Sequence, residues 1–119
     1  MKSDEAMSVT LQALSSAVRR QILDRVRDEP GMTVGALAAC FDISRIAVIK
    51  HLRVLEEATL LISRKDGRSR RLYFNAVPIQ MIHERWTDEY SAYWSSQLTQ
   101  LKFAAEKRAK DKKSKGREP

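Results

Sequence analysis

The sequence predicts a mainly α-helical domain of the winged helix-turn-helix class, with a long helix toward each end. Two short helices joined by a tight turn are expected before residue 58, which is the helix-turn-helix arrangement. The apolar spacing then changes from about 3.6 to about 2 residues over residues 61–75, where a strand–turn–strand segment would form the wing. A chain of 119 residues is long enough for one domain with a single modest core.

Apolar spacing and capping residues predict the helices that precede the turn. Ser15 or Ser16 can cap a second helix that runs to about Asp28, and Pro30-Gly31 ends it. Thr33 is the expected cap of a short third helix. A first helix is indicated by Met7, Leu11 and Leu14, and the second should turn Val18, Ile22, Leu23 and Val26 inward.

The segment S-R-I-A-V-I-K-H-L-R-V-L-E-E-A, residues 44–58, predicts an amphipathic recognition helix capped by Ser44. A step of about 100° per residue gives a core face of Val48, Leu52 and Leu55. The opposite face mixes apolar and cationic side chains, namely Arg45, Ile46, Ile49, Lys50 and Arg53. A DNA major groove suits this mixture, because phosphates attract cations, base edges accept hydrogen bonds and thymine methyls contact apolar groups. The alternative for the two isoleucines is packing against the third helix.

The wing is predicted from two alternating segments, residues 61–64 and 71–74, with Asp66-Gly67 as a strong hairpin signal between them. The arginines of this region are Arg64, Arg68, Arg70 and Arg71. Such a cluster favours contact with DNA phosphates or the minor groove over a merely solvated hairpin tip.

Pro78 is expected to open a long helix over residues 78–105, because proline is well tolerated in a first helical turn. Its stripe consists of Ile79, Ile82, Trp86, Tyr90, Tyr93, Leu98 and Leu101, with Trp94 beside it. The simplest interpretation of the stripe is a dimer seam, and the alternative is a small-molecule pocket within that seam. Residues 106–119 lack an apolar pattern and are predicted to form a basic disordered tail, so the domain would cover residues 1–105.

The charge of the chain indicates a polyanionic partner. Lysine and arginine number 22 against 15 acidic residues, which gives a formal net charge of +7. The excess lies in two blocks, residues 44–75 and 102–119, each with eight cations and three acids. No apolar run approaches the roughly 20 residues of a membrane span, and the acidic N-terminus does not resemble a signal peptide. We therefore expect a cytoplasmic protein without membrane contact.

Four segments carry a likeness to a known family, namely L-S-S-A-V-R-R-Q-I-L-D, M-T-V-G-A-L-A, I-S-R-I-A-V-I-K-H-L-R-V-L-E-E-A and L-I-S-R-K-D-G-R-S-R-R-L-Y-F. Over residues 8–100 the chain resembles the ArsR/SmtB family of bacterial transcriptional repressors. The resemblance implies a homodimer joined through its first and last helices, bound to double-stranded operator DNA. It also implies release by an effector, whose chemistry the sequence leaves open.

The sequence departs from that family at its metal sites and at one helix end. Cys40 stands alone where metal sensors carry a cysteine pair, and His83 is the only histidine of the last helix. Tight transition-metal sites need three or four such ligands, so we predict no metal and no cofactor. Cys40 would then be a small core residue, with redox sensing as the alternative. Thr59 replaces the glycine that commonly ends the recognition helix, and a β-branched residue adopts the left-handed conformation at a cost.

The sequence thus predicts a dimeric DNA-binding repressor acting on a palindromic operator. The alternative is a winged-helix module that binds another protein or nucleic acid without sequence preference. No catalytic motif is present, so an enzyme is not expected. His51 is expected to be half-buried and to bond a phosphate or a backbone carbonyl. The predicted DNA-binding residues are Ser44, Arg45, Ile46, Ile49, Lys50, His51, Arg53, Arg64, Arg68 and Arg70. The predicted dimer-interface residues are Leu11, Leu14, Ile82, Trp86, Tyr90, Tyr93 and Trp94.

Overall fold

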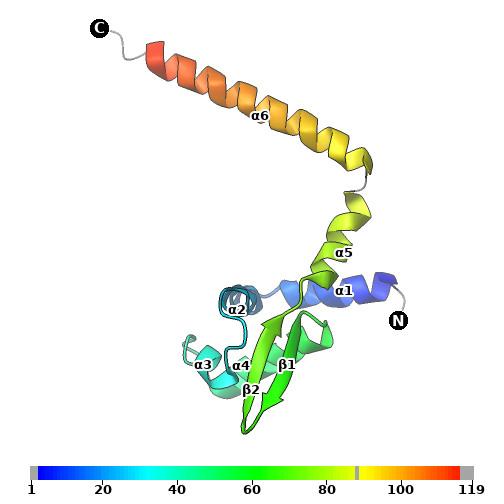
Figure 1. Cartoon of the computed structure of the whole chain (residues 1–119), viewed down its shortest axis with the longest axis vertical. Coiled ribbons are helices and arrows are strands. Elements are labelled where there is room, and N and C mark those ends of the chain that lie inside the picture. The colour runs from blue at the N-terminus through cyan, green and yellow to red at the C-terminus, as the bar shows by residue number, and fades with distance from the viewer. Residues whose placement is uncertain (1–2, 88, 116–119) are drawn as a thin grey trace. The chain divides into compact units, whose positions relative to one another are not determined.

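The computed structural model describes residues 3–87 and 89–115, with side chains for residues 4–87 and 93–111. The chain divides into two compact units, Met1–Ile82 and His83–Pro119. The first unit contains α1 (Ser3–Leu14), α2 (Ala17–Asp28), α3 (Val34–Ala38), α4 (Arg45–Glu57) and a hairpin of β1 (Leu61–Asp66) and β2 (Ser69–Phe74) (Figure 1). These elements form the winged helix-turn-helix that the sequence predicts.

Side-chain caps fix where the central helices begin. The hydroxyl oxygens of Ser16, Thr33 and Ser44 each accept a hydrogen bond from the backbone N–H three residues later, at 3.3, 3.1 and 3.1 Å. Each bond satisfies a donor that a helix start would otherwise leave unpaired. The predicted caps of the second, third and recognition helices are therefore confirmed.

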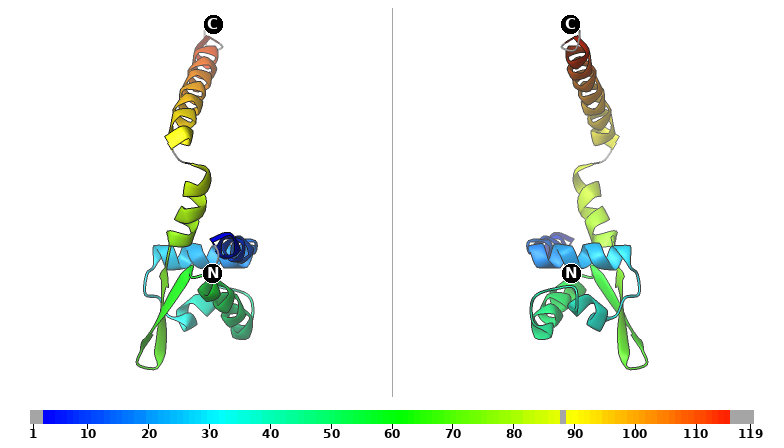
Figure 2. Two further views of the ribbon diagram at one scale, coloured as in Figure 1. Left: turned by 90° about the vertical axis from the view of Figure 1, so that its right-hand side faces the viewer. Right: turned by 90° about the vertical axis from the view of Figure 1, so that its left-hand side faces the viewer.

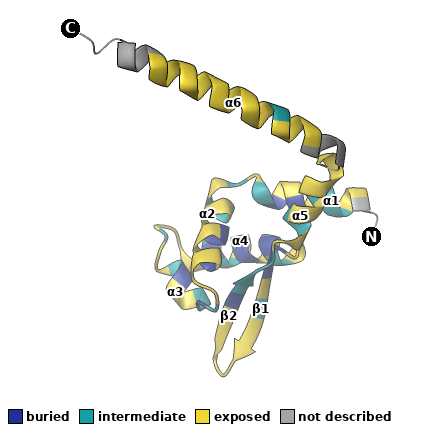
Figure 3. Ribbon diagram, turned by 45° about the horizontal axis from the view of Figure 1, so that its top comes forward, coloured by how far each residue is buried: buried dark blue, intermediate teal, exposed yellow. Residues whose placement is uncertain are grey.

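The core lies where α2, α3 and α4 meet the wing (Figures 2 and 3). The inward residues predicted for α2 and α4 lie in it, with Val18 partly buried at its edge. Its buried residues are Ala13, Ile22, Leu23, Val26, Met32, Leu37, Val48, Leu52, Leu55, Ala58, Leu60, Leu61 and Leu72.

Cys40 is exposed, so its prediction as a core residue is wrong. Because α3 ends at Ala38, Cys40 falls in the connection to α4 instead of on the inward side of a helix. Its thiol lies 3.4 Å from the carbonyl oxygen of Ala36 and donates to it.

The end of α4 is a Schellman turn with a threonine at the left-handed position. The N–H of Leu60 donates to the carbonyl of Leu55 at 2.9 Å, and the N–H of Thr59 donates to the carbonyl of Glu56 at 2.9 Å. Thr59 has φ of 56° and is the one non-glycine residue with positive φ in the described part of the chain. Asn75 holds this turn against the end of the wing by donating to the Thr59 carbonyl at 2.8 Å.

Thr59→Gly should raise the free energy of unfolding by about 0.5–1 kcal/mol. A side chain in the left-handed backbone conformation costs about 1–2 kcal/mol, and glycine removes that cost. The extra conformational freedom of glycine in the unfolded chain offsets part of the gain. Urea unfolding followed by circular dichroism measures the difference. Thr59→Ala keeps a Cβ and should give no gain, and equal stabilisation by alanine would contradict a backbone origin.

The wing is an antiparallel hairpin in which Leu61 pairs with Phe74 and Asp66 with Ser69. Both strands are two residues longer than the alternation predicted. Gly67 (φ 61°) and Arg68 form the loop, and positive φ at the first loop position is what a type II′ turn requires. Arg68 therefore lies at the tip of the wing.

A short third segment pairs with β2 and ties the wing to the helices. The N–H of Gly31 donates to the carbonyl of Leu72 at 2.8 Å, and the N–H of Leu72 donates to the carbonyl of Met32 at 2.9 Å. Thr33 continues this ladder as a bridge partner of Arg71. The wing is thus held at its inner end by the segment that leads into α3.

The predicted single helix over residues 78–105 is two helices, α5 (Val77–Trp86) and α6 (Glu89–Lys115). Beyond the end of α5, the Thr87 hydroxyl donates to the carbonyl of His83, a back-bond that competes with the helical ladder. The predicted disordered tail is also wrong for residues 106–115, which continue α6, while residues 116–119 lie outside the described residues. Among the described helices, none combines the length and apolar character that crossing a membrane requires.

Candidate nucleic-acid interface

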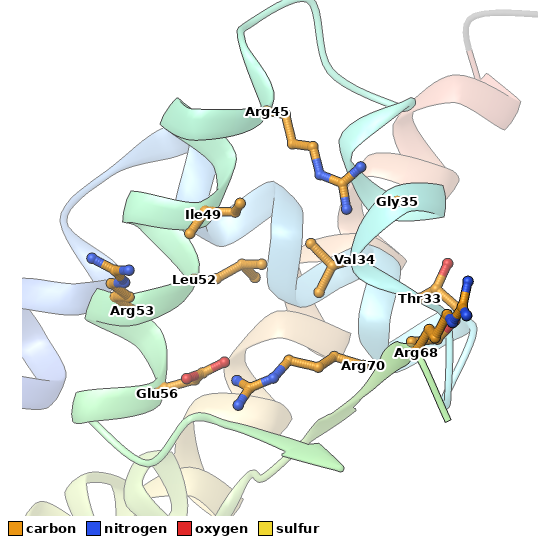
Figure 4. A pocket seen from close by; sticks show the side chains of 11 residues that line it. Thr33, Val34, Gly35, Arg45, Ile49, Leu52, Arg53, Glu56, Arg68 and Arg70 are labelled. Atoms are coloured by element: carbon orange, nitrogen blue, oxygen red, sulfur yellow. The ribbon is translucent and has the colours of Figure 1, made fainter. Parts of the chain in front are cut away.

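A groove of about 440 Å³ lies between α4, the start of α3 and the wing (Figure 4). Its floor is apolar, with buried Leu52 and half-buried Ile49 and Val34. Its rim carries guanidinium groups from two elements that are distant in sequence. The lining residues are Thr33, Val34, Gly35, Arg45, Ile49, Leu52, Arg53, Glu56, Arg68, Ser69 and Arg70.

The spacing of residues along α4 decides which of them face this groove. Arg45, Ile49, Leu52 and Glu56 follow one another at intervals of four, three and four residues, which keeps them on one side of a helix. Ile46 and Lys50 lie farther round the helix and are not in the lining. Ile46 is 69% exposed, so packing against the third helix is wrong for this residue.

The groove carries a net positive charge that the described part of the protein leaves largely uncompensated. Four lining residues are arginines and one is acidic. No described carboxylate forms a salt bridge with Arg45, Arg53, Arg68 or Arg70. Within the described residues, the one hydrogen bond from these guanidinia is a long contact of Arg70 with the Ser63 hydroxyl, at 3.4 Å. A polyanion can therefore approach without displacing strong internal partners.

Arg71 differs from the other wing arginines because the fold uses its guanidinium. It donates to Asp66 Oδ2 at 2.7 Å and to the carbonyl of Gly31 at 2.9 Å. The hydrogen bond with Asp66 and the charge of that carboxylate raise the pKa of Arg71. This arginine braces the wing against the segment before α3.

Half of the predicted DNA-binding residues line the groove, and the others lie elsewhere. Arg45, Ile49, Arg53, Arg68 and Arg70 are in the lining. Ser44 caps α4, Ile46 and Lys50 are exposed beside the groove, and the Arg64 guanidinium lies 5.8 Å from the centre of the Tyr73 ring.

His51 is half-buried, as expected, but its partner is a side chain. The Arg19 guanidinium donates to His51 Nδ1 at 3.2 Å, since arginine has only donors. The same guanidinium donates to the carbonyls of Ala13 at 2.8 Å and Gln12 at 3.1 Å, at the end of α1. In the free protein, the partner of His51 Nδ1 is thus a guanidinium and not a backbone carbonyl, and the contact of His51 with a DNA phosphate stays a prediction.

The predicted site omitted six of the residues that line the groove, among them Glu56 and Ser69. The interval pattern that starts at Arg45 could have identified Glu56. The contribution of Thr33, Val34 and Gly35 depends on pairing between the segment before α3 and β2, for which the sequence offers no local signal.

The predicted dimer-interface residues divide between the core and the solvent. Leu14 packs against the core, and Ile82 is half-buried. Large exposed surfaces are carried by Leu11, Trp86, Tyr93 and Trp94, and the side chain of Tyr90 lies outside the described residues. Among the side chains that the structure describes, no three of His, Cys, Asp and Glu are grouped to hold a metal ion.

Comparison with known proteins places the chain among transcriptional regulators. Residues 14–64 match the model of a helix-turn-helix domain family. The uncharacterised HTH-type regulator YuzN of Bacillus subtilis is 35% identical over 83 residues, which cover 65% of this chain and 90% of YuzN. The transcriptional repressor SdpR of the same organism is 30% identical over 74 residues, or 62% of this chain and 81% of SdpR.

Solved structures share the fold. The ArsR family transcriptional regulator RHA00566 superimposes with a TM-score of 0.65 at 31% identity, covering 78% of this chain and 94% of that one. A homodimeric winged helix-turn-helix DNA-binding domain from Mycobacterium bovis has the same fold, with a TM-score of 0.59 at 19% identity over 65% of this chain and 71% of that one. On the fold, the helix-turn-helix match and the identity with RHA00566 and YuzN, this chain belongs to the ArsR family of winged helix-turn-helix transcriptional regulators.

Proposed function

We propose that this regulator is a repressor that binds an imperfectly palindromic operator as a homodimer. The observation that carries the proposal is the groove in which α4 and the wing together present four arginines over an apolar floor. Phosphates attract such guanidinia. The exposed side of α4 next to the groove would meet base edges in the major groove.

The residues divide into two roles on this proposal. Arg45, near the start of α4, and Lys50, on its exposed side, read bases, because the early turns of a recognition helix contact base edges. Arg53, Arg68 and Arg70 hold phosphates on either side of that contact. The wing tip at Arg68 reaches the backbone or the minor groove beside the half-site.

A homodimer is supported by apolar surface that one chain leaves uncovered. Trp86, Tyr93 and Trp94 are between 54% and 63% exposed. An aromatic side chain buries about 150–250 Å², so several of them could supply an interface of about 800 Å² per subunit. A two-fold dimer presents two recognition helices to successive major grooves about 34 Å apart, which predicts half-sites one helical turn apart.

Selection of bound duplexes from a random library, followed by footprinting and sedimentation, tests the proposal. We expect a pseudo-palindrome, protection of two half-sites and a dimer in solution. Repression is tested by placing the selected site across a promoter in a transcription assay. Binding without any sequence preference would contradict the proposal and favour the alternative, a module for generic nucleic acid.

Lys50→Ala should cost about 1–3 kcal/mol of operator binding and relax the preference at one base pair of each half-site, as expected for a base contact. Binding to a panel of single-substituted operators measures both effects. Lys65→Ala removes an equivalent exposed charge from β1 and should leave the base preference intact. A uniform loss on operator and random DNA would show that Lys50 contacts phosphate only.

A further inference from the structure

We propose that Glu56 is a counter-charge within the DNA groove, one that competes with DNA phosphates for the groove arginines. Its carboxylate lowers the affinity for DNA of any sequence. Tight binding then requires base contacts in addition to phosphate contacts. The inference rests on the proposed role of the groove in contacting DNA, and it assigns a function to the one acidic residue of the lining.

The position of Glu56 is unusual for an acidic side chain. It is half-buried on the groove side of α4, one helical turn after Leu52 and three residues after Arg53. Figure 4 shows Arg70 extending from the wing toward the Glu56 carboxylate. The carboxylate therefore faces the guanidinium of Arg70 across the groove, where a phosphate of bound DNA would also be attracted.

Helix stability does not account for this residue. The last turn of α4 contains Glu56 and Glu57 and no basic residue. The end of a helix carries a partial negative charge, so acids there are unfavourable and cations favourable. Proteins break such local rules mainly at functional sites, and of the two glutamates only Glu56 lines the groove.

The effect of Glu56 on DNA binding follows from its charge. One carboxylate among four guanidinia cancels part of the attraction for phosphate through its charge, although it forms no salt bridge with any of them among the described residues. The cost applies to every sequence, whereas base contacts are made by the operator alone. Weak generic binding matters because a genome presents a vast excess of competing sites.

Glu56→Gln tests the inference, because the amide keeps the size of the side chain and removes its charge. Affinity for the selected operator and for a scrambled duplex should rise by a similar factor, about three- to tenfold at low salt, the size of one partly screened charge interaction. The slope of log affinity against log salt should steepen by about 0.9, which corresponds to one additional phosphate contact.

Two further variants locate the effect. Glu57→Gln makes the same change in net charge one residue away, at an exposed position outside the lining, and should change affinity much less. In an Arg70→Ala background the gain from Glu56→Gln should shrink, because one competing guanidinium is already absent. Thermal unfolding should show no loss of stability, and Glu56→Ala should change affinity in the same direction.

Three results would overturn the inference. Equal gains from Glu56→Gln and Glu57→Gln would assign the effect to the total charge of the chain. Weaker binding would show that the carboxylate holds the arginines in place. A change of preference at a single base pair would make Glu56 a base reader. The scrambled-duplex measurements require no palindrome, so failure of the proposed homodimer–operator mode would leave this inference separately testable.

Discussion

Replacing Arg53 and Arg70 together by alanine should weaken operator binding about 100-fold. Each guanidinium is expected to make a charge-assisted hydrogen bond with a phosphate, and at about 1.5 kcal/mol for each exposed contact two of them amount to about 3 kcal/mol. Loss of two such contacts should reduce the salt slope by about two units. Both residues line the groove, one on α4 and one on β2, so the double variant removes a cation from each wall. Fluorescence anisotropy over a range of salt concentrations measures affinity and slope together.

A charge-matched control separates the groove from the overall charge. Lys107→Ala with Arg108→Ala removes two exposed cations from α6. Neither residue is among those that line the groove, so operator affinity should fall by only a small factor and base preference should be unchanged. Comparable losses in the two double variants would contradict the assignment of the groove as the phosphate-binding surface.

Placing aspartates at Leu98 and Leu101 should convert the dimer to a monomer and remove high-affinity operator binding. Trp94, Leu98, Leu101 and Ala105 are spaced at intervals of four, three and four residues along α6, the spacing of a two-helix seam. Leu98 and Leu101 are 64% and 66% exposed in the single chain, so a second copy could bury both side chains. Aspartates at these positions would remove that apolar burial and place charges in the seam. Analytical ultracentrifugation gives the oligomeric state, and anisotropy gives the affinity.

The matched control for this variant uses a different side of the same helix. Ser95→Asp with Thr99→Asp adds the same charge at exposed positions on the side of α6 that carries neither the seam nor Tyr93. Dimerisation and operator binding should persist in that control. A Leu98→Asp, Leu101→Asp variant that remained dimeric would show that the interface lies elsewhere.

The sequence predicted the fold of the first unit well because its local signals agree with one another. Ser16, Thr33 and Ser44 are caps in the structure, and the apolar intervals of α2 and α4 match their buried faces. Even the left-handed conformation of Thr59 was anticipated from the position of the helix end. Each of these features depends on neighbours within a few residues.

The sequence predicted α6 poorly because the prediction weighted the apolar pattern above intrinsic helix propensity. Residues 102–115 contain six lysines and three alanines, which favour helices without any apolar stripe. Five of the eleven lining residues were predicted, Arg45, Ile49 and Arg53 from helical periodicity and Arg68 and Arg70 from the cluster of wing arginines. The contribution of Thr33, Val34 and Gly35 depends on the pairing of Gly31 and Met32 with Leu72, a long-range contact that periodicity does not reveal.

The hydrogen bonds of the Arg19 guanidinium would make dimerisation and DNA binding of such a regulator depend on each other. It bonds the end of α1, a helix that the family resemblance assigns to the dimer interface, and it bonds His51 in the middle of α4. Displacement of α1 therefore requires that this bond break or that α4 move with it. If the proposed dimer binds DNA, coupling free energies between the two sites are reciprocal. A molecule that weakens dimerisation would then weaken DNA binding by the same factor by which DNA strengthens dimerisation.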